Sequence, residues 1–192
     1  GMASSIEIEE AIQTARSAGC KELVVLHCVS GYPAPPSDYN LATIGDLSKR
    51  FDVITGLSDH TIDNVTAVTS VVLGASIIEK HVTLDRSGGG PDDSFSLEKD
   101  DLMALCNDAR SAWEALGSVN YNRKASEKNN TIFRRSLYFV TDLPKGTTVT
   151  QDHIRSIRPG YGAAPKYITN FLGKKIKQDV QYGDPATLDL IE

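Results

Sequence analysis

The sequence contains few cysteines, no long apolar run and no excess of positive charge. Its three cysteines, Cys20, Cys28 and Cys106, are far apart and form no CxxC pair, so we expect free thiols in a reducing cytoplasm. No apolar run reaches the roughly 18 residues that a membrane span requires, and we expect no signal peptide. The net charge of −5 argues against a nucleic-acid surface, which needs clustered basic residues. We therefore expect a cytoplasmic protein with neither a nucleic-acid partner nor a membrane segment.

The first part of the chain alternates between strand-like apolar runs and helical spacing. Helices are predicted over residues 6–18, 41–51, 61–73 and 96–116, and strands over 22–28, 53–57 and 75–78. Near-continuous apolar strands separated by amphipathic helices indicate a parallel sheet covered by helices. Three such strands cannot close a barrel, which takes eight. The pattern therefore predicts an α/β piece of a larger fold.

The pattern changes after residue 118. Residues 119–132 are polar and poor in apolar anchors, which is typical of a linker. Residues 133–192 predict a small, mostly β domain, with a strand at 136–140, a turn at 142–146, a turn or short helix and a strand within 149–157, a short helix at 167–172 and a strand pair within 174–180.

Two histidines follow two of the predicted strands. His60 comes just after the strand at 53–57, and His81 comes just after the strand at 75–78. In a parallel sheet the carboxyl ends of strands lie side by side, and ligands collect there. Two neutral imidazoles would suit a divalent transition metal that keeps open positions for substrate. From spacing alone, two ordinary loop histidines are an equally good interpretation.

Several segments, taken together, resemble the sialic acid synthase family over essentially the whole chain. They are residues 56–61 (GLSDHT), 79–86 (EKHVTLDR), 90–92 (GPD) and 158–160 (RPG), with His27 and residues 32–35 (YPAP) before them. Residues 89–98, 133–137 and 155–162 are most similar to the pseudaminic acid synthase branch. The histidine at His27, where that branch usually carries lysine, is commoner in the N-acetylneuraminate and legionaminate branches.

The resemblance implies a fold and an assembly. Residues 1–118 would be the last three strands and their helices of a (β/α)8 TIM barrel, residues 119–132 a linker, and residues 133–192 a SAF (antifreeze-like) domain of the β-clip type. In the family's homodimer, the SAF domain of one subunit caps the barrel of the other. The first five barrel strands would be missing, together with the lysines that bind phosphoenolpyruvate, so we expect this chain alone to be inactive.

The resemblance also implies a reaction. A transferase of this family condenses phosphoenolpyruvate with an acylamino sugar, here a 2,4-diacetamido-2,4,6-trideoxy hexose, to give pseudaminic acid and phosphate. The resemblance favours Mn²⁺ as the cofactor, with Mg²⁺ or Co²⁺ as substitutes. The alternatives are an N-acetylneuraminate or legionaminate synthase, a non-catalytic fragment, or a carbohydrate-binding SAF module.

Residue by residue, the resemblance makes His60 and His81 the metal ligands. Glu79 joins them in the catalytic set as a group that orients or partners His81. Tyr32 and Asp92 would contact the sugar, although packing on the proline-rich loop and turn formation are their ordinary roles.

The resemblance also assigns substrate-binding roles to two serines and one arginine, residue types that often have ordinary structural roles. Ser30 and Ser58 would approach the phosphate or carboxylate of phosphoenolpyruvate. Ser58 could equally be a helix N-cap, and a cap is the favoured role of Asp59. Arg158 would reach the sugar's acylamino group in the partner's barrel. The roles of Arg134 and Arg135 stay open.

Overall fold

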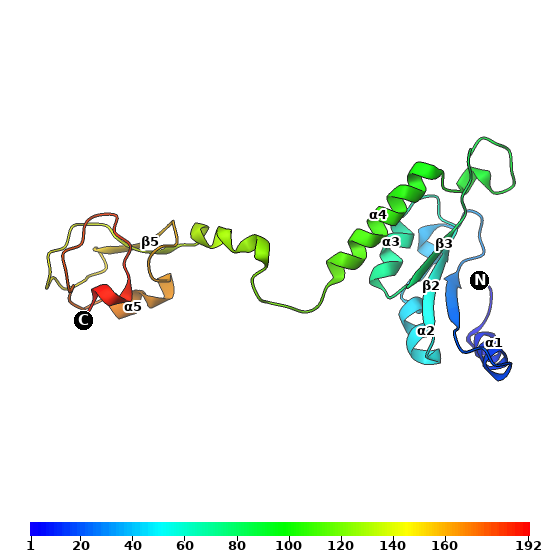
Figure 1. The fold of residues 1–192 in the computed structure, drawn as a ribbon, viewed down its shortest axis with the longest axis horizontal. Helices are drawn as coiled ribbons and strands as arrows, with labels where there is room; N and C mark the ends of the chain where they lie inside the picture. The colour runs from blue at the N-terminus through cyan, green and yellow to red at the C-terminus, as the bar shows by residue number, and fades with distance from the viewer. The chain divides into compact units, whose positions relative to one another are not determined.

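Three parallel strands form the centre of the first part of the chain. The structure is a computed structural model that describes residues 1–192 as two units, Gly1–Val119 (the first unit) and Asn120–Glu192 (the second unit). In the first unit, β1 (Val24–Cys28), β2 (Ile54–Asp59) and β3 (Ile77–Lys80) pair in the order β1-β2-β3 (Figure 1). The predicted parallel sheet is therefore confirmed.

Helices α2 (Thr43–Phe51) and α3 (Val65–Val72) pack on one face of this sheet, and α4 (Lys99–Leu116) packs against α3. Helix α1 (Ser5–Ser17) is joined to the end of α2, where Arg16 donates to the backbone oxygens of Phe51 and Asp52. The apolar core joins Ile44 of α2, Leu57 of β2, Ala67 of α3 and Leu105 of α4. These residues follow the helical spacing and strand alternation seen in the sequence, so burial of their apolar surface fixes how the elements pack.

The other face of the sheet is not covered by helices. Because successive strand residues point to opposite faces and Val24 is paired with Ile54, and Gly56 with Ile77, these residues share one face. Val24, Ile54 and Ile77 are 37%, 54% and 44% exposed. We call this surface, with Ser58 and Glu79 further along the same strands, the open face.

Three predicted helices of the first unit begin later than expected, and α2, predicted from residue 41, does so by the smallest margin, at Thr43. The helix predicted from residue 61 starts at Val65, because residues 60–64 form a turn held by side chains. The helix predicted from residue 96 starts at Lys99, where Glu98 and Asp101 form a reciprocal capping box that satisfies the first free N–H groups. No helix of the chain combines the length and apolarity needed to cross a membrane.

The second unit is a small antiparallel β structure with its own core. Strands β4 (Ser136–Phe139) and β5 (Ile154–Ile157) pair antiparallel, and α5 (Ile168–Phe171) packs beside them. Its buried core includes Leu137, Phe139, Ile154, Phe171 and Ile176. The strand pair predicted within 174–180 is wrong in form, because this stretch makes only isolated bridges, such as Leu143 with Val180.

The stretch expected to be a linker carries some regular structure. Residues Ala125–Glu127 and Asn129–Phe133 form the 3-10 helices η3 and η4. The exact linker limits, 119–132, stay a prediction.

Gly56 and Gly45 offer a matched test of the packing in the first unit. A Cβ at Gly56 would lie 2.5 Å from the backbone oxygen of Ile77, whereas one at Gly45, inside α2, would meet no atom closer than 3.8 Å. We expect Gly56→Ala to lower the free energy of unfolding by about 1–3 kcal/mol and Gly45→Ala to raise it by about 0.5–1 kcal/mol. The single tryptophan, Trp113 in α4, lets fluorescence follow this unit alone. A Gly56→Ala variant as stable as the parent would contradict the packing described.

Candidate active site

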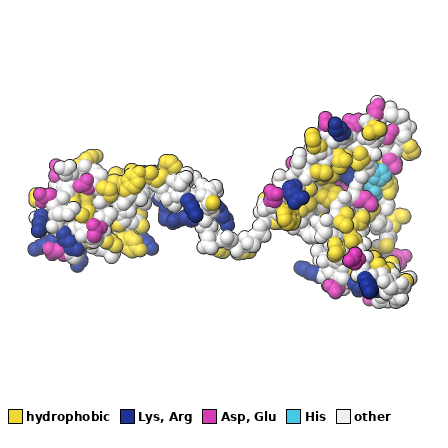
Figure 2. All heavy atoms as spheres, viewed as in Figure 1, with side chains coloured by type: hydrophobic (Ala, Val, Ile, Leu, Met, Phe, Trp, Pro, Cys, Tyr) yellow, Lys and Arg dark blue, Asp and Glu magenta, His cyan; other side chains and the backbone are white.

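His60 and His81 lie next to one another at the carboxyl ends of two paired strands. His60 directly follows β2 and His81 directly follows β3. Their ring centroids are 5.2 Å apart with the rings steeply inclined to each other. Histidine side chains are visible at the surface of the first unit, beside acidic groups (Figure 2). The structure therefore brings together the two histidines that the sequence singled out.

Aromatic rings surround the pair. The Tyr32 ring lies 4.3 Å from that of His60 and 5.9 Å from that of His81, and it is 55% exposed. Phe95, which is buried, lies 5.3 Å from the His81 ring. No pattern in the sequence assigns Phe95 to the site. Together these rings form an apolar wall beside the imidazoles, with Tyr32 on its solvent side.

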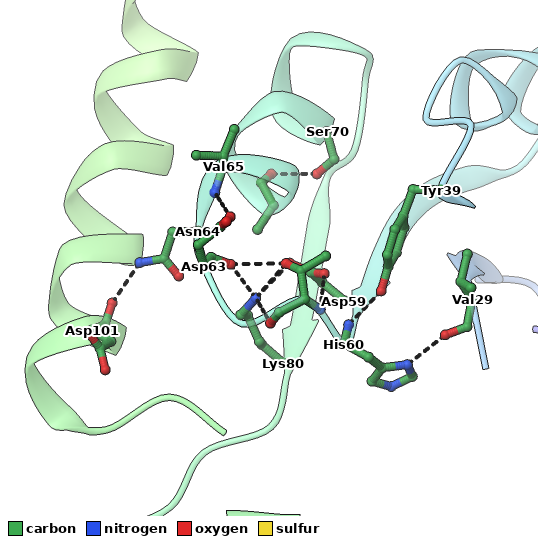
Figure 3. Close-up of polar contacts among 12 residues, drawn as sticks. Val29, Tyr39, Asp59, His60, Asp63, Asn64, Val65, Ser70, Lys80 and Asp101 are labelled. Atoms are coloured by element: carbon green, nitrogen blue, oxygen red, sulfur yellow. Dashed lines mark hydrogen bonds and ion pairs between the residues drawn. The ribbon is translucent and has the colours of Figure 1, made fainter. Parts of the chain in front are cut away.

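Hydrogen bonds fix the orientation of the His60 ring. Its Nδ1 lies 2.8 Å from the backbone oxygen of Val29, and its backbone N–H donates to the Tyr39 hydroxyl at 2.6 Å (Figure 3). A carbonyl oxygen can only accept, so the neutral ring carries its proton on Nδ1. The lone pair of Nε2 is thereby left free for a metal ion or another acid.

His81 has an acidic neighbour. Its Nδ1 lies 3.4 Å from a carboxylate oxygen of Asp92, whose side chain is about half exposed. The loop that carries Asp92 is folded back by Asp93, which accepts hydrogen bonds from the Thr83 hydroxyl and the Gly90 N–H, both at 2.7 Å. Asp92 therefore lies beside an imidazole, where it can orient that ring or bind a hydroxyl group.

Ser58 and Glu79 form a second polar pair on the open face. They are register partners on β2 and β3, and the Ser58 hydroxyl donates to Glu79 at 2.8 Å. Glu79 and His81 share a face because they are two residues apart. The alternative role of Ser58 as a helix N-cap is wrong, and so is the predicted cap at Asp59: both lie inside β2, and α3 begins only at Val65.

On the opposite face of the same strands, Lys80 and Asp59 form a buried ion pair with a separation of 2.8 Å. The Lys80 ammonium also donates to the backbone oxygens of Thr61 and Asp63, at 2.8 and 2.6 Å (Figure 3). Neither residue was assigned to the site from the sequence. Strand alternation does place both on the helix-covered face, where a charged side chain needs a partner.

His27 and Ser30 are not among the side chains that contact the two histidines, and Arg158 belongs to the second unit. The His27 ring is hydrogen-bonded through Nε2 to the backbone oxygen of Tyr39, and Ser30 is exposed on the loop after β1. Arg158 is exposed in the second unit, just after β5.

The loop that carries Arg158 is anchored by Ser136, whose hydroxyl donates to the Pro159 oxygen at 2.8 Å and accepts from the Gly162 N–H at 2.9 Å. Of the arginines left open by the sequence, Arg135 donates to the backbone oxygen of Ser156.

The donor atoms near the histidines fit a divalent metal only in part. No group of three or more His, Cys, Asp or Glu side chains is arranged to hold a metal ion. The chain does offer two neighbouring imidazoles, one with a free Nε2, and nearby carboxylates at Asp92 and Glu79. Such a set suits an ion whose remaining positions are filled by water or substrate.

Comparison with known proteins gives matches over nearly the whole chain. Residues 1–121 match the NeuB family and residues 134–192 match the SAF domain. The chain is 36% identical to a pseudaminic acid synthase of Campylobacter jejuni, over 96% of this chain and 54% of that protein. It is 37% identical to an N,N'-diacetyllegionaminic acid synthase of the same species, over 91% and 53%.

A solved structure is similar as well. The N-acetylneuraminic acid synthetase of Leptospira borgpetersenii, solved in complex with citrate, aligns with a TM-score of 0.61 and 35% identity, over 68% of this chain and 45% of that one. The chain spans about half the length of the curated relatives it matches.

Tyr39, which holds the backbone of His60, is fully buried, and burial raises the pKa of its hydroxyl to about 12. The unfolded chain has the ordinary value of about 10. Because Tyr39 ionises less readily in the folded chain, its contribution to the free energy of unfolding is fully present below a pH of about 10. That contribution is lost as pH rises from about 10 to about 12, since the unfolded chain then ionises first.

We therefore expect Tyr39→Phe to cost about 1–3 kcal/mol at neutral pH, because the His60 N–H loses its acceptor. The difference from the parent should shrink as pH rises from about 10 to about 12. Denaturant unfolding followed by Trp113 fluorescence at each pH measures both effects. A difference that stays constant through this window would show that Tyr39 titrates normally.

Proposed function

The chain belongs to the NeuB family and carries a SAF domain, and we propose that it supplies part of a nonulosonic acid synthase, a transferase that condenses phosphoenolpyruvate with an acylamino sugar. The observation that carries this proposal is the pair His60 and His81 at neighbouring strand ends, with Nε2 of His60 free. The relatives named above support the reaction class through identities of about 36% over nearly the whole chain.

The proposed reaction forms one carbon–carbon bond and breaks one carbon–oxygen bond. C3 of phosphoenolpyruvate attacks the aldehyde carbon of the open-chain sugar, whose oxygen takes up a proton and becomes a hydroxyl. Water adds to C2 and loses a proton. The bond from C2 to the phosphate oxygen then breaks, which leaves a keto group at C2 and releases inorganic phosphate.

The side chains around the histidines have separate roles in this proposal. His60 and His81 would hold a divalent metal, most simply Mn²⁺ with Mg²⁺ or Co²⁺ as substitutes, and the ion would polarise the aldehyde oxygen. Asp92, beside His81, orients that ring or accepts a hydrogen bond from a sugar hydroxyl. The exposed Tyr32 ring packs on the apolar side of the sugar.

Phosphoenolpyruvate brings negative charge to the site. Ser30 offers a hydroxyl donor for its carboxylate or phosphate, and Ser58 would do the same once its one hydroxyl proton turns from Glu79 to the ligand. Glu79 would then be free to take up or give a proton during the reaction.

The sugar is proposed to be the 2,4-diacetamido-2,4,6-trideoxy hexose that yields pseudaminic acid. Legionaminate is the second candidate, because the identity to a legionaminic acid synthase is equally high. The histidine at His27 keeps the legionaminate alternative open, and its ring is hydrogen-bonded to the Tyr39 backbone oxygen.

The first test is phosphate release from phosphoenolpyruvate with Mn²⁺ and each candidate sugar, using this chain alone and then fused to the N-terminal barrel half of a family member. We expect turnover only in the fusion. There His60→Ala or His81→Ala should lower kcat on the order of 100-fold or more, whereas His153→Ala in the second unit should not. Turnover by the chain alone, or by the fused His60→Ala variant at the parent rate, would contradict the proposal.

Arg158 tests the proposed homodimer, in which the SAF domain of one subunit caps the partner's barrel. In the fusion, Arg158→Ala should lower kcat/KM for the sugar about 10- to 100-fold, the worth of one charge-assisted hydrogen bond. The KM for phosphoenolpyruvate should not change. Arg155→Ala, a nearby exposed arginine whose side chain donates to the Gln151 backbone, is the control. If Arg158→Ala and Arg155→Ala lowered kcat/KM equally, the proposed contact of Arg158 with the sugar would be contradicted.

A further inference from the structure

We propose that the buried Lys80–Asp59 pair positions His60 relative to His81. The inference rests on the proposed function in one respect, that the two histidines act as a pair. Lys80 directly precedes His81, and its ammonium bonds to residues on both sides of His60, namely Asp59 and Thr61. One side chain thus connects the two strand ends that carry the imidazoles.

The ammonium is fully engaged. It donates to an Asp59 carboxylate oxygen at 2.8 Å, to the Thr61 backbone oxygen at 2.8 Å and hydroxyl at 3.2 Å, and to the Asp63 backbone oxygen at 2.6 Å. The other carboxylate oxygen of Asp59 accepts from the Thr61 N–H at 2.9 Å. The turn after β2 is therefore closed around the ammonium, with His60 at its start (Figure 3).

Stability alone does not account for such a pair. The side chains of Lys80 and Asp59 are 3% and 0% exposed, so both charges have lost their hydration. Replacing a buried ion pair by apolar groups of similar volume is often neutral or stabilising. What an apolar pair could not do is bind the Thr61 and Asp63 oxygens. These are the contacts that keep residues 60–64 out of the helix.

Four anchors then define the place of His60. Its backbone N–H is held by Tyr39, its backbone oxygen by the Ala34 N–H at 3.1 Å and its ring Nδ1 by Val29, while Lys80 fixes the residues on either side. The first three hold His60 to the segment that follows β1, whereas Lys80, beyond the strand pairing itself, ties the turn after β2 to the end of β3. Loss of the Lys80 anchor should shift His60 relative to Val29 and let its ring proton exchange between Nδ1 and Nε2.

The test compares two variants with the parent chain. Lys80→Met leaves the buried Asp59 carboxylate without its counter-charge and should lower the unfolding midpoint strongly. The double variant Asp59→Asn/Lys80→Met removes both charges and should recover most of that loss. The matched control is Asp46→Asn/Arg50→Met, which removes the exposed ion pair on α2 and should change nothing.

The first readout needs no metal. Nitrogen-detected NMR of the histidine rings at about pH 8.5, some two units above the ordinary histidine pKa of about 6.5, reports which nitrogen carries the proton. His60 should show protonated Nδ1 in the parent and a mixture in the double variant. His153, whose Nδ1 accepts from the Thr150 N–H, should show the opposite tautomer in every variant.

The second readout is Mn²⁺ affinity by titration, which should fall about 10- to 100-fold in the double variant, the usual cost of losing a group that orients a ligand. A double variant with the parent's His60 tautomer would overturn the proposal, as would one that fails to fold while the control folds. A parent chain that binds no Mn²⁺ would count against the proposed metal, and the tautomer would still decide this inference.

Discussion

The parallel pairing of β2 with β3 is the constraint on which the candidate site depends. Ser58 is level with Glu79 and Asp59 with Lys80, so one more residue on each strand brings His60 level with His81. Because strand residues alternate between faces, the same register sends Ser58, Glu79 and the histidines to one side and Asp59 and Lys80 to the other. The side chains of the candidate site and the Lys80–Asp59 ion pair therefore come from alternate residues of the same two strands and the residues that follow them.

Much of this arrangement can be predicted from the sequence, because it follows from local pattern. Apolar runs that end shortly before His60 and His81, with a helical stretch between them, are enough to predict a strand–helix–strand unit with both imidazoles at one edge. The resemblance to the sialic acid synthase family then supplied the barrel and SAF assignments, and the family comparisons confirm them. Apolar periodicity reports burial, so it succeeds wherever burial decides the structure.

The remainder depends on contacts between distant residues, which no local pattern encodes. Residues 61–64 have helical spacing, yet Lys80, some nineteen residues later, binds their carbonyl oxygens and delays α3 to Val65. Tyr39 lies in an irregular, proline-rich stretch with no periodicity, and only the folded chain brings its hydroxyl to the His60 N–H. In the second unit, isolated bridges replace the predicted strand pair, because short β segments there pair with partners far along the chain.

The uncovered sheet face sets how the isolated chain should behave in solution. Val24, Ile54 and Ile77 expose aliphatic side chains side by side, and contiguous apolar surface on a sheet favours association with any similar surface. The apparent free energy of unfolding of the chain should therefore depend on protein concentration, on salt and on any added partner polypeptide. Purification yield, apparent mass on a sizing column and tolerance of storage should all depend on this aliphatic stripe.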